Sequence, residues 1–146
     1  MKTKKIIVSG LIAGIVAFIV GSLLYMNPLV SGVYAQYSNY PCSKPMDVFG
    51  GLINWLFLML IGGVVSAVFM AFLYAFTEKG IDIKPAWKKG LLFGFLLFLV
   101  NKLPTSYYSW LMYTYPNVLN VIETFNGLIG GLVGGVTLAV VYAKLK

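Results

Sequence analysis

The sequence predicts an all-α membrane protein with four transmembrane helices in a single domain, residues 1–146. Hydrophobic residues make up 60% of the chain and charged residues only 10%, which is unlike an ordinary soluble domain. Four apolar stretches each come close to the roughly 20 helical residues that cross a bilayer core of about 30 Å. These stretches cover residues 6–25, 48–76, 86–103 and 121–143. Helices are expected because unpaired backbone amides cannot face lipid.

Lysines gather at alternate ends of these stretches. Nine lie on one side of the predicted membrane: Lys2, Lys4, Lys5, Lys79, Lys84, Lys88, Lys89, Lys144 and Lys146. The other side holds only Lys44 and Lys102. Because short lysine-rich loops stay in the cytoplasm, both termini are expected there, and the cell membrane is the expected location. Topology thus explains the net charge of +7, and no nucleic-acid partner is expected.

The first stretch has a second interpretation. Its lysine-rich start, its apolar middle and the triplet at residues 33–35 fit a cleaved signal peptide. However, the apolar run is longer than is usual for such a segment, and Pro28 separates it from the triplet. A retained helix is therefore expected.

The first outer loop contains the single cysteine, Cys42. One cysteine can form neither an intramolecular disulfide nor a thiolate metal cluster, and no metal or cofactor is expected. Cys42 is either a tolerated loop thiol or, in an oxidising compartment, part of an intermolecular disulfide.

The second and fourth stretches begin with similar segments. Residues 47–53 read Asp-Val-Phe-Gly-Gly-Leu-Ile, and residues 123–129 read Glu-Thr-Phe-Asn-Gly-Leu-Ile. Lysine pairs also open both odd stretches, which gives possible repeats over 4–80 and 88–146. The prediction is two tandem, like-oriented helical hairpins related by an axis along the membrane normal. The alternative is a chance match in a chain so rich in Gly, Leu and Ile.

Small residues recur at four-residue spacing, most regularly in the fourth stretch. In lipid such rows let helix backbones approach closely. The predicted packing positions are Gly127, Gly131, Gly135, Gly10 and Gly14. A second row in the fourth stretch, Gly130 and Gly134, exceeds what one neighbour needs. A homo-oligomer, or another membrane protein as partner, is therefore expected.

Polar residues near membrane depth form the candidate site. Asp47 and Glu123 open the even stretches, and Asn54 and Asn126 lie below them on the same helix faces. If the repeat is real these faces meet, and their oxygens suit a hydrated cation or a proton. Alternatively, Asp47 and Glu123 lie near helix N-termini, where a negative charge is stabilising. Asn120 and Glu123 would then form a capping box. Of these residues, Asn54 is expected to lie deepest.

Lys102 is the remaining member of the candidate site. With Asn101 it interrupts the third stretch, which predicts a short third helix ending near Pro104. Lys102 either snorkels outward along its methylenes or pairs with Glu123 or Asp47. A short, proline-flanked span is also a feature of binding sites in transporters.

The second outer loop is aromatic. Residues 105–115 are expected to lie along the membrane surface as a short interfacial helix or lid. The outer aromatic surface consists of Tyr107, Tyr108, Trp110 and Tyr113. It either anchors the protein at the headgroups or receives a partner protein, a lipid or an apolar ligand.

Enzyme activity is not expected. The chain has no histidine and no arginine, so the usual general bases and anion clamps are absent, and no phosphate-loop motif follows the glycines. The expected function is that of a structural or partner-binding component of the membrane. The alternative is a small oligomeric channel or transporter for a cation or proton.

The end of the first stretch resembles a known family. Gly21, Tyr25, Pro28 and Leu29 resemble the Gly, aromatic, Pro, Leu pattern of small four-span membrane proteins that are catalogued only as a domain of unknown function. This resemblance implies a four-span fold, and it implies no activity.

Overall fold

The computed structural model describes residues 2–40 and 44–145, so Cys42 lies outside the described residues. Within these ranges the secondary structure is helical. The elements are α1 (Lys2–Met26), α2 (Pro28–Gln36), the 3₁₀ turn η1 (Met46–Phe49), α3 (Leu52–Thr77), α4 (Ala86–Leu97), the π-helical turn η2 (Phe98–Lys102), α5 (Leu103–Met112) and α6 (Asn117–Lys144).

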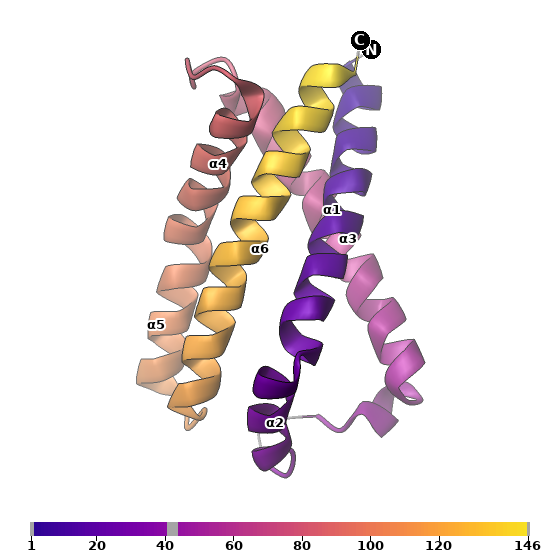
Figure 1. Cartoon of the computed structure of the whole chain (residues 1–146), viewed down its shortest axis with the longest axis vertical. Coiled ribbons are helices and arrows are strands. Elements are labelled where there is room, and N and C mark those ends of the chain that lie inside the picture. Colours follow the sequence, from indigo (N-terminus) through magenta and orange to yellow (C-terminus); the bar gives the residue numbers. More distant parts are fainter. Residues whose placement is uncertain (1, 41–43, 146) are drawn as a thin grey trace.

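Four helices are long and apolar enough to cross a membrane, which confirms the predicted fold class. They cover Thr3–Met26, Leu52–Thr77, Ala86–Met112 and Asn117–Lys144. The prediction that the third helix ends near Pro104 is wrong, because α4, η2 and α5 form one continuous rod (Figure 1). In η2 the Leu103 N–H donates to the Phe98 carbonyl, five residues back. This wider turn accommodates Pro104, which has no N–H to donate.

The four long helices are arranged in the order α3, α1, α6, α4. α6 packs against both α1 and α4, whereas α3 packs mainly against α1. Both termini lie together at one end of the bundle (Figure 1). We call this the lysine-rich end, after Lys4, Lys5, Lys88, Lys89 and Lys144. The opposite end, which carries α2, α5 and the turn before α6, is the aromatic end.

Glycines make the α4–α6 contact close. A Cβ atom at Gly94 would overlap the Gly131 carbonyl, and a Cβ at Gly90 would overlap the Gly135 carbonyl. The second glycine row of α6 faces a different neighbour, since Gly134 lies 3.8 Å, measured from an ideal Cβ, from the Ala17 Cβ on α1. Gly134 of the second row therefore faces α1 of the same chain, whereas an ideal Cβ at Gly130 would meet nothing within 4 Å.

The lysine-rich end holds the packed core. Tyr74 of α3 is 2% exposed, and its ring packs edge-on against Phe93 and Tyr142, with centroid separations of 5.1 and 5.5 Å. This contact holds α3 against α4 and α6. Toward the aromatic end α3 diverges from the other helices (Figure 1). As a result only 6% of its apolar window is buried, compared with 28% for α1.

The two similar segments have different conformations. The first enters η1 and then turns at Gly50 and Gly51, whose φ angles of 82° and 97° favour glycine. The second, residues 123–129, lies entirely within α6. In addition, the α1–α6 contact has no equally extensive counterpart between α3 and α4. The tandem repeat stays a prediction, and the segments that indicated it are not structurally equivalent.

Candidate functional site

A polar cluster surrounds Glu123 at the aromatic end. The Tyr34 hydroxyl donates to Glu123 Oε1 at 3.3 Å, and the Tyr115 hydroxyl donates to the same oxygen. The Lys102 Nζ lies 3.6 Å from Glu123 Oε2, so of the two predicted alternatives for Lys102 the structure has the ion pair. One carboxylate thereby connects α2, η2 and the turn before α6, and we call this group the Glu123 cluster.

Local sequence explains how two of these side chains reach Glu123. Asn27 caps α2, because its Oδ1 accepts from the Val30 N–H at 3.0 Å, and Pro28 occupies the first helical position. This short helix carries Tyr34 to α6. Lys102 reaches Glu123 across a glycine, since an ideal Cβ at Gly127 would lie 2.7 Å from the Lys102 Cγ.

The Glu123 cluster is rich in hydrogen-bond donors. Burial and, secondarily, the Glu123 carboxylate raise the pKa of Tyr34 above its ordinary value, so Tyr34 stays protonated and keeps donating. The Tyr34 ring packs edge-on against Tyr25, with centroids 5.8 Å apart. Nearby, the Asn126 Nδ2 is buried and forms no hydrogen bond with any described residue. The cluster has one carboxylate and one ammonium group, so its net charge is close to zero.

A second polar contact joins α5 to α6. The Asn120 Nδ2 donates to the Ser106 carbonyl at 2.9 Å, and the Thr124 and Ser106 hydroxyls lie 2.8 Å apart. Asn120 is buried inside α6, whose N-cap residue is Pro116. The predicted capping box of Asn120 and Glu123 is therefore wrong, because the helix begins one turn earlier than the apolar pattern indicated.

The other predicted site residues lie elsewhere. Asp47 is exposed in η1, and α3 begins at Leu52 with no side-chain cap. Asn54 is exposed in the first turn of α3, where its amide donates to the Gly50 carbonyl at 3.3 Å, so it does not lie deep. Figure 1 shows this end of α3 apart from the start of α6. The structure thus brings together Lys102, Glu123 and Asn126, and it leaves Asp47 and Asn54 outside the cluster.

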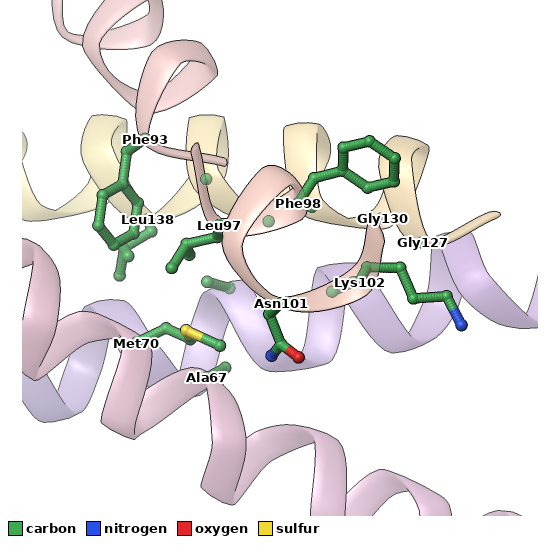
Figure 2. Close-up of a pocket in the computed structure, with 15 residues that line it drawn as sticks. Ala67, Met70, Phe93, Leu97, Phe98, Asn101, Lys102, Gly127, Gly130 and Leu138 are labelled. Carbon is green, nitrogen blue, oxygen red and sulfur yellow. The ribbon is translucent and has the colours of Figure 1, made fainter. Parts of the chain in front are cut away.

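A cavity of about 220 Å³, lined by residues of α1, α3, the third helix and α6, lies next to the Glu123 cluster. Its wall is mostly apolar, and its polar lining residues are Asn101 and Lys102. Figure 2 shows the Asn101 side chain pointing from η2 toward α3, and the Lys102 side chain running past Gly127. We call this space the α3–η2 cavity.

The outer aromatic surface lies on α5 and the turn that follows it. Its four side chains are more than half exposed: Tyr107 57%, Tyr108 57%, Trp110 56% and Tyr113 68%. The Tyr107 ring lies 6.0 Å from the Tyr108 ring and 6.1 Å from the Trp110 ring. Such amphipathic rings are suited to the headgroup level of a membrane.

Sequence reasoning missed three parts of this region. Tyr34 and Tyr115 are not among the predicted residues of the candidate site, and Asn101 is treated only as an interruption of an apolar run. For Tyr34 a signal existed, because Asn27 followed by Pro28 is a typical start of a helix. For Tyr115 and Asn101 the distances depend on how distant helices pack.

Comparison of the chain with known protein families, with curated proteins and with solved structures finds no match. The resemblance of Gly21, Tyr25, Pro28 and Leu29 to a four-span family therefore stays an interpretation of those four residues.

Proposed function

We propose that this protein is a non-enzymatic, structural or partner-binding component of the membrane that associates through α3, first of all with a second copy of itself. One observation carries the proposal. Ideal Cβ atoms at Gly62 and Gly63 of α3 would meet nothing within 4 Å, and Ser66, one turn farther along, is exposed as well. Small residues of this kind allow helices in lipid to approach closely.

Several other glycines of the long helices face a neighbour within the chain, although ideal Cβ atoms at Gly21 and Gly130 also meet nothing within 4 Å. An ideal Cβ at Gly10 would lie 2.6 Å from the Val68 Cα, and one at Gly14 would lie 2.8 Å from the Val64 Cα. Gly90 and Gly94 of α4 meet Gly131 and Gly135 of α6 in the same way. Gly62, Gly63 and Ser66 thus form a packing surface without a partner in the chain, which supports an intermolecular contact.

The test is energy transfer between donor- and acceptor-labelled copies of the full chain in liposomes, measured while the lipid-to-protein ratio is raised. Replacing both Gly62 and Gly63 by Leu should weaken association by about tenfold, since close backbone contact is lost. Gly130→Leu is the matched control, because Gly130 lines the α3–η2 cavity inside the chain. Equal association of all three proteins would contradict the proposal.

If wild-type copies do not associate, a different membrane protein is the partner. The same variants then distinguish a specific contact from adventitious capture. A protein that co-purifies from native membranes with wild type and with Gly130→Leu, but is lost from the double variant, is the expected result. Retention by the double variant would contradict an α3 contact.

The lysine-rich end is proposed to face the cytoplasm, with the protein in the cell membrane, because short lysine-rich segments are retained there. In this orientation Cys42 follows α2 on the outer side. A membrane-impermeant maleimide should therefore label Cys42 in intact cells. Labelling that requires lysis would show the opposite orientation, provided that a denatured sample shows a free thiol.

The alternative of a small cation or proton channel stays a prediction. The pairing of carboxylates on which it depends is not favoured by the described geometry, since Asp47 lies away from Glu123 and Lys102 pairs with Glu123. Ion flux in proteoliposomes that is abolished by Glu123→Gln would support the channel.

A further inference from the structure

The α3–η2 cavity has an apolar end and a polar end. Phe93 and Leu138, only 4% and 2% exposed, close it toward the lysine-rich end. Asn101 stands near the other end, with Met70 across from it on α3 (Figure 2). A molecule in the cavity therefore contacts apolar atoms along its body and one amide near its head.

The volume of the cavity limits what it can hold. A cavity of about 150 Å³ holds one benzene ring, so the 220 Å³ found here accommodates about nine non-hydrogen atoms. Ten residues of a helix, about 15 Å long and 10 Å wide, would require on the order of 1,000 Å³. A helix from another protein is thus too large, whereas a segment of a single alkyl chain fits.

The charges of the wall limit the chemistry of the head. Lys102 is the charged lining residue, and its ammonium is already paired with the Glu123 carboxylate at 3.6 Å. A charged head would have no free counter-ion among the lining residues, and burying an unpaired charge is costly. An uncharged, hydrogen-bonding head is favoured.

Asn101 supplies the partner for such a head. Its side chain is exposed and forms no hydrogen bond with any described residue, although its backbone carbonyl accepts from the Thr105 hydroxyl at 2.7 Å. The adjacent Lys102 lies against Gly127, about 15 Å from the start of α6 at Asn117. With α6, which is about 42 Å long, centred on a hydrocarbon core about 30 Å thick, the Asn101 amide would lie within the hydrocarbon. There an amide without a partner is costly.

We infer that the α3–η2 cavity binds a long-chain amphiphile with an uncharged hydroxyl head, of the fatty-alcohol class. About eight carbons of the alkyl chain fill the space beside Gly130 and Met70, the rest of the chain leaves through the open side of the cavity, and the hydroxyl forms a hydrogen bond with the Asn101 amide. The inference does not depend on association through Gly62 and Gly63, which lie outside the lining of this cavity.

The test is photolabelling of the full chain in phosphatidylcholine liposomes with hexadecanol that carries a diazirine group. Saturable labelling of the peptides containing Met70 and Phe98, competed by plain hexadecanol, is the expected result. Gly130→Leu fills the cavity and should reduce this labelling by tenfold or more. Asn101→Leu removes one hydrogen bond and should reduce it by roughly threefold to tenfold.

Two matched variants serve as controls. Gly62→Leu adds the same side chain to another open glycine, and Asn54→Leu removes another exposed amide, both outside the cavity. Both should label like the wild type. Non-saturable labelling, labelling unchanged in Gly130→Leu and Asn101→Leu, or an equal loss in the two controls would each overturn the inference. Intermolecular energy transfer of the same proteins reports on association separately.

Discussion

The α4–α6 interface and the aromatic-end half of α3 use the same residue type in opposite ways. At the interface, glycines of one helix lie against the backbone of the other, with no room for a Cβ at Gly90, Gly94 or Gly135. On α3, Gly62 and Gly63 have nothing within 4 Å of a Cβ. Both sets occur in apolar helices of similar length.

The difference shows what holds a small membrane protein together. Lipid is as apolar as leucine, so burying apolar side chains adds little, and close backbone packing and hydrogen bonds between helices decide which helices stay together. α6 has both, namely the glycine contacts and the Glu123 cluster. α3 is fixed mainly by its contact with α1 and by Tyr74 near the lysine-rich end, and little of its apolar window is buried.

A substitution at the α4–α6 interface should have the largest effect on stability. Gly94→Leu places a Cβ atom where the Gly131 carbonyl stands and adds three more carbon atoms beyond it, so the helices must separate. We expect a loss of about 3 kcal/mol or more in the free energy of unfolding, measured by denaturation in detergent. Gly62→Leu, on the open side, should stay within about 0.5 kcal/mol of wild type. Similar losses for both would show that the two glycine sets are not distinct.

The fixed part of α3 depends on one aromatic side chain. Tyr74→Ala removes the ring that contacts Phe93 and Tyr142, and the resulting cavity should cost about 3 kcal/mol. The distribution of distances between spin labels on α3 and α4 near the lysine-rich end should then broaden. Phe76→Ala, at a side chain that is 82% exposed, is the control and should leave the distance distribution unchanged. A narrow distribution in Tyr74→Ala would mean that other contacts hold α3.

Substitutions in the Glu123 cluster should have a smaller effect on stability. Glu123→Leu leaves Lys102 without its counter-ion and Tyr34 without its acceptor, which should cost about 1–3 kcal/mol and speed proteolysis within α2. Glu123→Gln keeps an acceptor for Tyr34 and loses the ion pair, which for groups that are 32% exposed should cost only about 0.2–1 kcal/mol. Equal proteolysis of α2 in wild type and Glu123→Leu would show that the cluster does not hold α2 against α6.

Much of the candidate site lay beyond the sequence. The sequence predicts Lys102 and Glu123 as one of two possible ion pairs, the other being Lys102 with Asp47, because charged groups near membrane depth require partners. The similarity of residues 47–53 to residues 123–129 predicts instead that Glu123 lies close to Asp47. That similarity could not show that one segment turns at Gly50 and Gly51 while the other continues as a helix.

The ends of the helices could also be predicted only in part from the sequence. Apolarity marks where a helix enters lipid, and it does not mark where a helix begins. For this reason α6 starts at Asn117 rather than near residue 121, and the third helix continues past Pro104 to Met112. The hydrogen bonds of these helix ends use residues such as Ser106 and Asn120, which an apolarity pattern ignores.

The sequence by itself determined four membrane-crossing helices, because the length and apolarity of a segment are local properties and lipid leaves the backbone no other regular choice. Only the tertiary structure decided which glycines are covered, which acid meets Lys102, and that Asn101 faces an open cavity. These features depend on the order and the crossing of helices far apart in the chain. In lipid, that arrangement is set by close backbone packing and a few hydrogen bonds rather than by the apolar pattern that all four helices share.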